Sequence, residues 1–331
     1  MKGKAFIIGG TGYIGFHISS EFAKKGYEVT ALALDEAPAG LLPEQVKVVK
    51  CNTDTLTDEE LEEMMRGHKY FVFAAGVDDR FTPKAPSFPV FYKANVESIK
   101  RLMVIAKKAG ITKVAICNSY FAYFDRIWPE MHLAERHPYI RSRKLQREEA
   151  FALGGKEMPV AILELPYIVG TTPSKGSLWK PLVKYVKGKS GTVYYTAGGT
   201  AVVSVRNVAE AVVNALERIT DNLACPVADK NMMWEEWLLA LRPDKSKQFK
   251  IRIIPSWIIK IAMFFLMLKH KLEGKESGLN PIGMVDLQTK KTFLPIEECK
   301  SKLGYGSYDF DQDMQDTVKL CVELLEKEIK T

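Results

Sequence analysis

The feature that most constrains the fold is a glycine run, Gly9-Gly-Thr-Gly-Tyr-Ile-Gly15, between a short apolar stretch and a helical pattern. Residues 5–8 predict a buried strand, and residues 12–25 predict a helix that ends at Gly26. Glycines at this spacing allow a tight turn, a close approach of the backbone to a pyrophosphate, and close packing of helix on strand. Because a helix N-terminus attracts negative charge, the pattern predicts a dinucleotide-binding loop. Its residues are Gly9, Thr11, Gly12, Tyr13, Ile14 and Gly15.

Apolar runs alternate with helical patterns through the first half of the chain. Strands are expected at residues 28–34, 46–50, 70–74, 113–117 and 160–165, and helices at 95–109 and 138–153. Thr57 and Glu60 form a predicted capping box that opens a further, charged helix. This alternation predicts an α/β fold of the Rossmann type, in which a doubly wound parallel sheet is covered on both faces.

The second half is less regular. Strands are expected at residues 192–195 and 201–205, and helices at 208–218, 233–241, 255–269 and 311–330. We therefore predict a dinucleotide-binding Rossmann domain over residues 1–170. Residues 171–331 are predicted to form a smaller, mixed substrate-binding lobe that is interleaved with the sheet.

Composition restricts the partners. The net charge of +7, from 47 basic and 40 acidic residues, suits an anionic cofactor or a membrane surface. The chain has no Lys/Arg block and no nucleic-acid motif, so no nucleic-acid partner is expected. Its five cysteines are scattered, with no CxxC pair, which indicates reduced thiols, no metal site and a cytoplasmic protein. The N-terminal apolar stretch is too short for a secretory signal. The sequence also leaves a homodimer as a partner to be considered.

The end of the predicted second strand bears on the choice of cofactor. An acid there favours NAD and an arginine favours NADP, but this chain has Ala33 and Leu34. Asp35 follows and is either a ligand of the adenine-side ribose or a solvated turn residue. Since no base is present to hold a 2′-phosphate, NAD(P) is expected with a slight preference for NAD.

Several motifs together resemble a known family. They are GGTGYIG, the Ala74-Ala75-Gly76 segment, the helix from Asn95, Ser119 with a downstream tyrosine, LELPYIVG at 163–170 and KLGY at 302–305. With them the chain resembles the extended short-chain dehydrogenases/reductases, the NAD-dependent epimerase/dehydratase family, over essentially its whole length. The resemblance implies cofactor contacts at Ala74, Ala75, Gly76 and Asn95, and backbone contacts to the nicotinamide amide at Pro166 and Tyr167. Glu164 stands where an arginine is common, and the sequence does not explain it.

The resemblance also implies a tyrosine acid/base, a serine that binds the reacting oxygen, and a lysine four residues after the tyrosine. Here Ser119 and Tyr139 match, but the fourth residue is Arg143, followed by Lys144. At about 100° per residue, Arg143 lies roughly 40° from Tyr139 around the helix and Lys144 roughly 140° away. Ser119, Tyr139 and Arg143 are therefore the expected catalytic residues, with Tyr139 and Arg143 also touching the cofactor.

Arginine can supply charge and hold ribose hydroxyls, but it does not readily relay a proton. His132 and His137 are the nearest sequence candidates for that relay, unless they are ordinary surface or packing residues.

Two apolar features concern the substrate. Aromatic residues follow Ser119 and the predicted fourth strand, and they either line a pocket for a flat, apolar substrate or pack the core. They are Tyr120, Phe121, Tyr123, Phe124, Trp128, Phe81, Phe88, Phe91 and Tyr92. Residues 253–268 form an apolar stretch with bases on both sides, and about 16 residues is short for a span of roughly 20. This stretch is either a buried helix of the substrate lobe or a helix that lies in a membrane interface.

These observations favour an NAD(P)-dependent oxidoreductase that acts on a secondary alcohol or ketone of a hydrophobic small molecule, steroid- or terpenoid-like. One alternative is a nucleotide-sugar epimerase or dehydratase. Another is a dinucleotide-binding sensor without catalysis, which the arginine at position 143 suggests.

Overall fold

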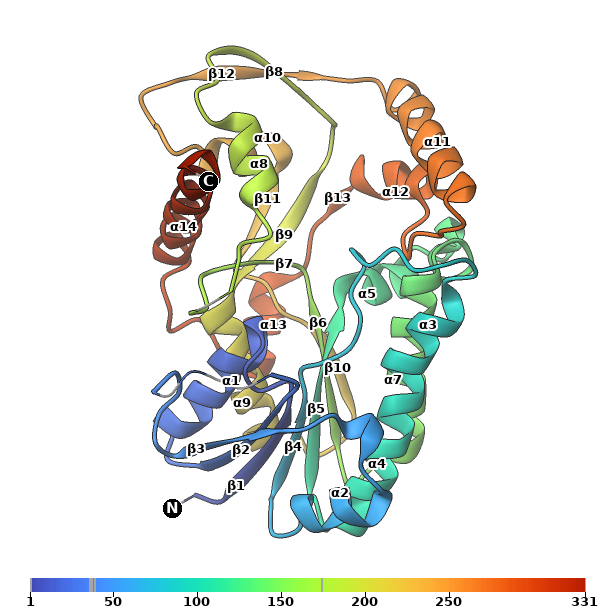
Figure 1. Ribbon diagram of the computed structural model, residues 1–331, viewed down its shortest axis with the longest axis vertical. Coiled ribbons are helices and arrows are strands. Elements are labelled where there is room, and N and C mark those ends of the chain that lie inside the picture. Colours follow the sequence, from blue (N-terminus) through green and yellow to red (C-terminus); the bar gives the residue numbers. More distant parts are fainter. Residues whose placement is uncertain (1, 36–37, 39, 174, 331) are drawn as a thin grey trace.

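A seven-stranded parallel sheet forms the centre of the molecule (Figure 1). The structure is a computed structural model that describes residues 2–35, 38, 40–173 and 175–330. Its strands are β1 (Lys4–Ile8), β2 (Glu28–Ala33), β3 (Val46–Lys50), β4 (Tyr70–Phe73), β5 (Lys113–Ser119), β6 (Val160–Leu165) and β10 (Leu223–Pro226). They are ordered β10-β6-β5-β4-β1-β2-β3, and every neighbouring pair is parallel. The order reverses between β1 and β4, the switch point at which such sheets bind ligands. The predicted Rossmann-type fold is confirmed.

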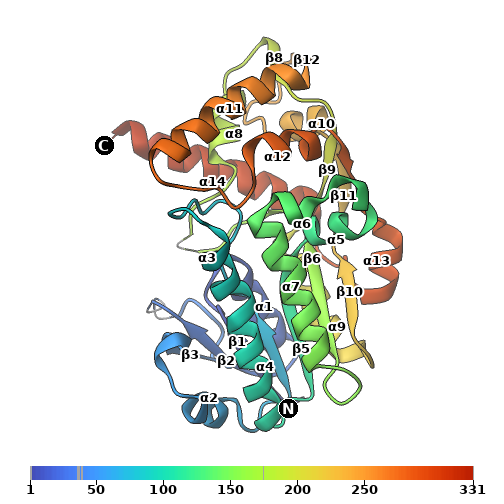
Figure 2. The same ribbon diagram turned by 90° about the vertical axis from the view of Figure 1, so that its right-hand side faces the viewer.

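Helices cover both faces of the sheet (Figures 1 and 2). One face carries α1 (Tyr13–Lys24) and α9 (Val205–Arg218), and the other carries α2 (Asp58–Met65), α4 (Ser98–Lys108) and α7 (Pro138–Leu153). The side chains of β1 alternate accordingly, because Ala5 and Ile7 join the first core and Phe6 and Ile8 the second. Burial on both faces explains why the strands read as apolar runs.

Several predicted boundaries move. The helix expected at 95–109 begins earlier, as α3 (Phe88–Tyr92) and a π-helical segment, η2 (Lys93–Glu97), that lead into α4. The fifth strand extends to Ser119, and α9 begins at Val205 because the hydroxyl of Ser204 accepts bonds from the first backbone N–H groups. The capping box is confirmed, since the Glu60 N–H donates to the Thr57 hydroxyl over 3.2 Å.

The later part of the chain builds the opposite end of the molecule. A four-stranded sheet and a two-stranded sheet lie there, formed by β7 (Tyr167–Val169), β9 (Gly199–Ser204), β11 (Lys230–Met233) and β13 (Lys291–Thr292), and by β8 (Gly191–Tyr195) and β12 (Phe249–Ile253). The remaining helices are α5 (Tyr120–Ile127), α6 (Leu133–Arg136), α8 (Lys180–Val186), α10 (Trp234–Ala240), α11 (Ser256–Leu272), α12 (Pro281–Gln288), α13 (Ile296–Leu303) and α14 (Phe310–Lys330). Two short 3₁₀ turns are η1 (Thr53–Thr55) and η3 (Pro129–Met131).

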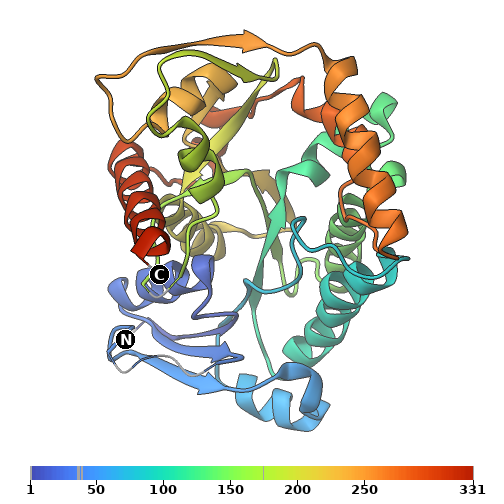
Figure 3. The same ribbon diagram turned by 45° about the horizontal axis from the view of Figure 1, so that its top comes forward.

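The apolar helix α11 lies at the edge of the molecule, away from the central sheet (Figure 3). Among its described residues none is buried. The interpretation of residues 253–268 as a buried helix is therefore wrong, because α12 is its main packing partner among the described residues and most of its surface stays uncovered. No helix in the described part of the chain is both long and apolar enough to cross a membrane.

Candidate active site

The glycine loop forms a cradle between β1 and α1. Gly9 has a φ of +82°, which favours glycine, and a Cβ on Gly15 would lie 2.0 Å from the Gly9 carbonyl oxygen. Within the described residues, no side chain caps the first turn of α1 and no acid lies in that turn. The N-terminus of α1 is thus open to an anion, as the pyrophosphate of a dinucleotide requires.

The turn after β4 faces this loop across the switch point. A Cβ on Gly9 would lie 2.7 Å from the Ala74 carbonyl oxygen, so the two turns are in close contact. Asn95, fully buried in η2, holds the second turn, since its side chain accepts from the Val77 N–H and donates to the Val77 carbonyl, both over 3.0 Å. The Asn95 side chain therefore shapes the segment 74–77.

The three expected catalytic residues come together at the C-terminal ends of the strands. Tyr139 and Arg143 lie on α7, and Ser119 ends β5 and caps α5 through the Phe121 N–H. The Arg143 guanidinium lies 5.2 Å from the centre of the Tyr139 ring, as the helical spacing predicted. Lys144 points away from the site and pairs with Asp125 over 3.3 Å.

Opposing effects act on the Tyr139 phenol. Burial raises the pKa of Tyr139 and the charge of Asp79 raises it further, whereas Arg143 and the Ser119 hydroxyl lower it. The net direction is upward, so the phenol holds its proton at neutral pH. Tyr139 is thus prepared as an acid, and positive charge beside it favours its action as a base.

Arg143 is held in a buried polar cluster. One of its terminal nitrogens donates to the Gln146 side chain over 3.0 Å and to the Cys117 carbonyl over 3.5 Å. Gln146 in turn accepts from the Asn118 side chain and donates to the Asn95 carbonyl over 2.7 Å. Arg143 is only 6% exposed, yet its Nε has no hydrogen-bond partner among the described residues. This orphaned donor fits a ribose hydroxyl of a bound dinucleotide.

A second charge lies near the tyrosine. Burial, helped by Asp78, raises the pKa of Asp79, while Arg80 and Arg143 act in the opposite direction. Asp78 itself forms an exposed ion pair with Arg80. Within the polar loop after β4, the charge of Asp79 raises the pKa of Tyr139, and the charge of Arg80 also interacts with the Tyr139 phenol.

The two histidines differ in their surroundings. His132 is exposed and lies 3.2 Å from Glu135. His137 is fully buried, and its Nδ1 accepts from the Asn280 N–H over 2.9 Å. Burial lowers the pKa of His137 to about 4, and Arg136 contributes in the same direction. His137 is consequently a neutral packing residue at neutral pH and joins α7 to the segment before α12.

Glu164, which the sequence left unexplained, is fully buried at the end of β6. Its carboxylate receives two donors from Arg126 of α5, one over 2.8 Å, and lies 3.9 Å from Arg147 of α7. Glu164 thereby joins the helix that starts at Ser119 to the helix that carries Tyr139.

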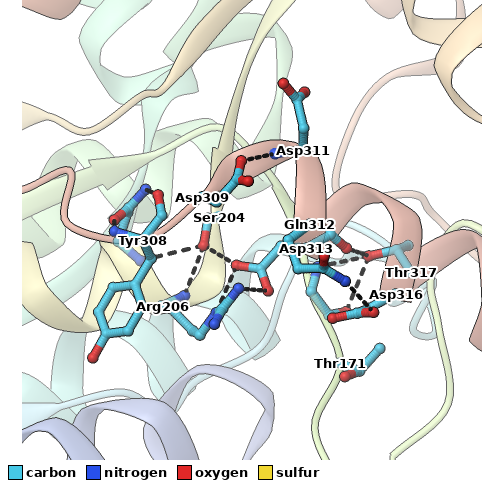
Figure 4. Close-up of polar contacts among 12 residues, drawn as sticks. Thr171, Ser204, Arg206, Tyr308, Asp309, Asp311, Gln312, Asp313, Asp316 and Thr317 are labelled. Atoms are coloured by element: carbon cyan, nitrogen blue, oxygen red, sulfur yellow. Dashed lines mark hydrogen bonds and ion pairs between the residues drawn. The ribbon is translucent and has the colours of Figure 1, made fainter.

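The C-terminal helix is linked to the cradle by hydrogen bonds. The Tyr13 hydroxyl donates to the Gly170 carbonyl over 3.1 Å, and the Gly170 N–H donates to the Thr317 hydroxyl of α14 over 2.7 Å. Figure 4 shows how α14 is anchored, with the Asp313 carboxylate between the Ser204 hydroxyl and the Arg206 guanidinium, 2.8 Å from the latter. The Tyr13 side chain therefore links the loop to the later part of the chain.

The remaining predicted cofactor residues lie at the same edge of the sheet. Asp35 follows β2 and is exposed, and Pro166 is buried directly after β6. The Tyr167 ring packs against Trp179, with 5.2 Å between ring centres. The contact of Asp35 with the adenine-side ribose stays a prediction.

Most of the aromatic residues after Ser119 pack a core. Tyr120, Phe121 and Phe124 are buried together with Phe91 in one cluster. Core packing, the second interpretation, therefore holds for these four side chains, and Tyr120 also contacts Tyr167 of β7 and Thr200 of β9. Phe81, on the loop after β4, is 49% exposed.

Comparisons with known proteins agree with this geometry. Residues 5–224 match the model of the "NAD dependent epimerase/dehydratase family". A crystal structure of the protein gox2253 shares 19% identity, 98% of this chain and 99% of that one, with a TM-score of 0.75. A UDP-N-acetylglucosamine 4-epimerase from Bacillus cereus shares 12% identity, 97% of this chain and 99% of its own, with a TM-score of 0.67. The structure of MoeE5 in complex with UDP-glucose and NAD has 16% sequence identity to this chain and a TM-score of 0.63. The match covers 98% of this chain and 100% of MoeE5.

No protein of curated function matches the chain. The family model nevertheless spans the glycine loop and the Tyr139 helix and reaches the start of the last strand of the central sheet. The chain belongs to the NAD-dependent epimerase/dehydratase family.

Proposed function

We propose that this chain is an NAD-dependent enzyme that oxidises a carbinol carbon of a nucleotide sugar and reduces the sugar again, as an epimerase or dehydratase does. The observation that carries the proposal is the meeting of Tyr139, Ser119 and Arg143 beside the open N-terminus of α1. The family supports NAD chemistry, and similar structures were solved with UDP-glucose and NAD or are UDP-sugar epimerases. These neighbours favour a nucleotide sugar over the hydrophobic substrate expected from the sequence.

The cradle between β1 and α1 would hold the cofactor pyrophosphate at Gly9, Gly12 and Gly15. Arg143, with its unpartnered Nε, would hold the ribose next to the nicotinamide. Asp35 would reach the other ribose, and no arginine or lysine stands at Ala33 or Leu34 to hold a 2′-phosphate. Bound NAD would supply the nicotinamide that takes up and returns a hydride.

The proton steps belong to Tyr139. Its phenolate form, which the charge of Arg143 favours against the upward effect of burial, accepts the proton of the substrate hydroxyl during oxidation, and the resulting phenol returns that proton on reduction. Ser119 hydrogen-bonds the same substrate oxygen and orients it towards Tyr139. Arg143 stabilises the phenolate, since a positive charge 5.2 Å from the ring opposes the effect of burial.

A second candidate is net oxidation of an apolar alcohol. The half-exposed Phe81 on the loop that carries Asp79 favours it, because an apolar side chain there would contact an apolar substrate.

One experiment separates the two. The purified protein is heat-denatured and its released cofactor is identified; the native protein is then incubated with UDP-sugars, and the products are followed by NMR and by absorbance of NADH. A new sugar without net NADH supports the first candidate, and NADH formed only from apolar alcohols supports the second.

Variants of two tyrosines test the site itself. Tyr139→Phe should lower turnover by about 10²–10⁴-fold, the usual contribution of a positioned acid/base, and leave bound NAD unchanged. Tyr123→Phe, on the neighbouring helix α5, is the matched control and should retain activity. Near-normal turnover of Tyr139→Phe would refute the assignment.

A further inference from the structure

Helix α11 presents two different sides. Its inner side packs on α12, where Lys260 pairs with Asp286 over 2.6 Å and Met263 and Met267 are half-buried. Large apolar side chains on the rest of the helix, and just before and at its ends, are exposed. They are Ile253 (63%), Trp257 (63%), Ile258 (43%), Ile261 (51%), Phe264 (48%), Phe265 (62%), Leu266 (37%), Leu268 (40%) and Leu272 (81%).

The exposed residues form a continuous stripe. Trp257, Ile261, Phe264, Phe265, Leu268 and Leu272 follow the spacing of one helix face. At about 100° per residue they all fall within a sector roughly 100° wide. An isolated exposed leucine needs no explanation, but a stripe that runs the length of a helix marks a surface that contacts something apolar. We call these six residues the outer stripe.

Charge around the outer stripe is of one sign. From Phe249 to Leu272 the sequence has no Asp or Glu, but it contains Lys250, Arg252, Lys260, Lys269 and Lys271. Among the described residues no carboxylate pairs with Lys250, Arg252 or Lys271. Glu273, the first acid after the stripe, lies 3.9 Å from Lys269 and 2.9 Å from Lys275, so one carboxylate serves two lysines.

A hollow with several bases lies at the C-terminal end of α11, on its inner side. A cavity of about 240 Å³ at the C-terminal end of α11 is lined by Arg136, His270, Lys271 and Lys275 together with one acid, Glu276. The carboxylate of Glu276 already accepts from the Ser87 N–H over 2.6 Å. Arg136 and Lys275 are themselves paired with Asp286 and Glu273, whereas Lys271 has no carboxylate partner among the described residues.

We propose that α11 is a membrane-surface anchor, whose outer stripe lies in the interface of a bilayer that carries anionic phospholipids. An apolar stripe flanked by lysines, with a tryptophan near one end, is the pattern of helices that lie in the plane of such an interface. The apolar side chains enter the boundary of the acyl chains, and the bases contact the lipid phosphates.

The charges distinguish this occupant from a second copy of the chain. A symmetric dimer through the outer stripe would place the same cluster of bases against itself, and the described part of the stripe contains no acid to offset it. An anionic surface satisfies both the apolar area and the charge.

The anchor also bears on the active-site loop. The Ala85 N–H donates to the Gly274 carbonyl over 2.9 Å. Lys84 and Lys275 form an isolated antiparallel β-bridge outside the named strands. The end of α11 is thus bonded to the loop that carries Asp79 and Phe81. Binding of α11 to a bilayer places that loop near the membrane surface.

Vesicle flotation of the full chain tests the anchor. Wild-type protein should float with phosphatidylcholine vesicles that contain 30% phosphatidylglycerol, and it should stay at the bottom with pure phosphatidylcholine or in 0.5 M salt. Lys271→Gln should weaken binding about fivefold, the usual effect of one base near an anionic surface. Phe265→Glu should weaken it by at least about tenfold, because it puts a charge into the apolar stripe.

The matched control is Val104→Glu on α4, which is 44% exposed and lies at the far end of the molecule (Figure 1). It should float like wild type, and both glutamate variants should keep the wild-type melting temperature because the replaced side chains are exposed. Absence of wild-type flotation, or equal losses in Phe265→Glu and Val104→Glu, overturns the anchor. A dimer in sedimentation that Phe265→Glu dissociates, without vesicle binding, would assign the stripe to a second copy instead.

Discussion

Glu164→Gln is a sharp test of how the catalytic helices are held. The glutamate is fully buried and has two arginine neighbours, of which Arg126 is 31% exposed and Arg147 only 10% exposed. Glutamine keeps the shape and one acceptor for Arg126, but it removes the charge. Arg147 then stays buried without a countercharge, whereas Arg126 can turn towards water.

Loss of one partner from a buried ion pair costs about 3–5 kcal/mol. Because Arg126 is partly hydrated and glutamine still accepts one bond, we expect the lower end, about 3 kcal/mol. At roughly 2.1 cal/mol/K of unfolding entropy per residue, a chain of this length should melt about 4 °C lower. The matched control is Glu149→Gln on α7. Glu149 forms a partly exposed ion pair with Lys100 over 3.1 Å, a shorter distance than the 3.9 Å between Arg147 and Glu164. That exposed pair should change stability by no more than about 0.5 kcal/mol.

Thermal unfolding followed by circular dichroism measures both variants at one pH and salt concentration. Distance alone ranks the Lys100 pair above the Arg147 contact, while burial ranks them in the opposite order. Equal melting temperatures for Glu164→Gln and Glu149→Gln would show that the buried carboxylate does not hold α5 and α7 to β6.

Two further predictions concern titratable and charged groups, one at the site and one at the start of α7. Arg143→Lys keeps the positive charge and should retain or improve turnover, and an inactive lysine variant would show that the guanidinium has a special role. Arg143→Gln should move the pH–rate profile to higher pH, because it removes a charge that lowers the pKa of Tyr139. As the pH falls, His137 takes up its proton at a higher pH in the unfolded chain than in the folded protein, where its pKa is lowered to about 4. Its contribution to stability is complete above the unfolded pKa near 6.5 and falls as the pH drops towards 4, by about 2 kcal/mol at pH 5. Denaturant unfolding at pH 7.5 and 5 should show a smaller difference for His137→Gln than for wild type, and equal differences would contradict the neutral, buried state.

The first half of the fold was predictable because its signals are local. Strand and helix periods, the glycine loop and the Thr57 capping box each lie within a few residues of sequence. The orientation of Arg143 towards Tyr139 also followed from helical spacing alone. By contrast, β10 is four residues long and gains its place only by pairing with β6, which no local pattern records.

Features that depend on distant partners were missed or misjudged. Glu164 is explained by Arg126, which is 38 residues away and approaches only when α5 packs on β6. The apolar stretch of α11 was open between two interpretations because hydropathy gives the preference of a helix for apolar surroundings, but not whether the fold supplies them. The aromatic residues after Ser119 presented the same ambiguity, and the fold buries them.

An epimerase or dehydratase leaves its substrate with no net change in oxidation state, so it gains from a cofactor that stays bound between the two hydride steps. In this chain the glycine loop is linked to the C-terminal helix α14. Tyr13 bonds Gly170, Gly170 bonds Thr317, and α14 is fixed by the ion pair of Asp313 with Arg206. Separating the loop from α14 therefore requires the loss of two neutral hydrogen bonds and of one partly exposed ion pair, as well as loop movement. That cost suits a retained cofactor better than one exchanged at every turnover, and it is a physical reason to place epimerase or dehydratase chemistry before net oxidation.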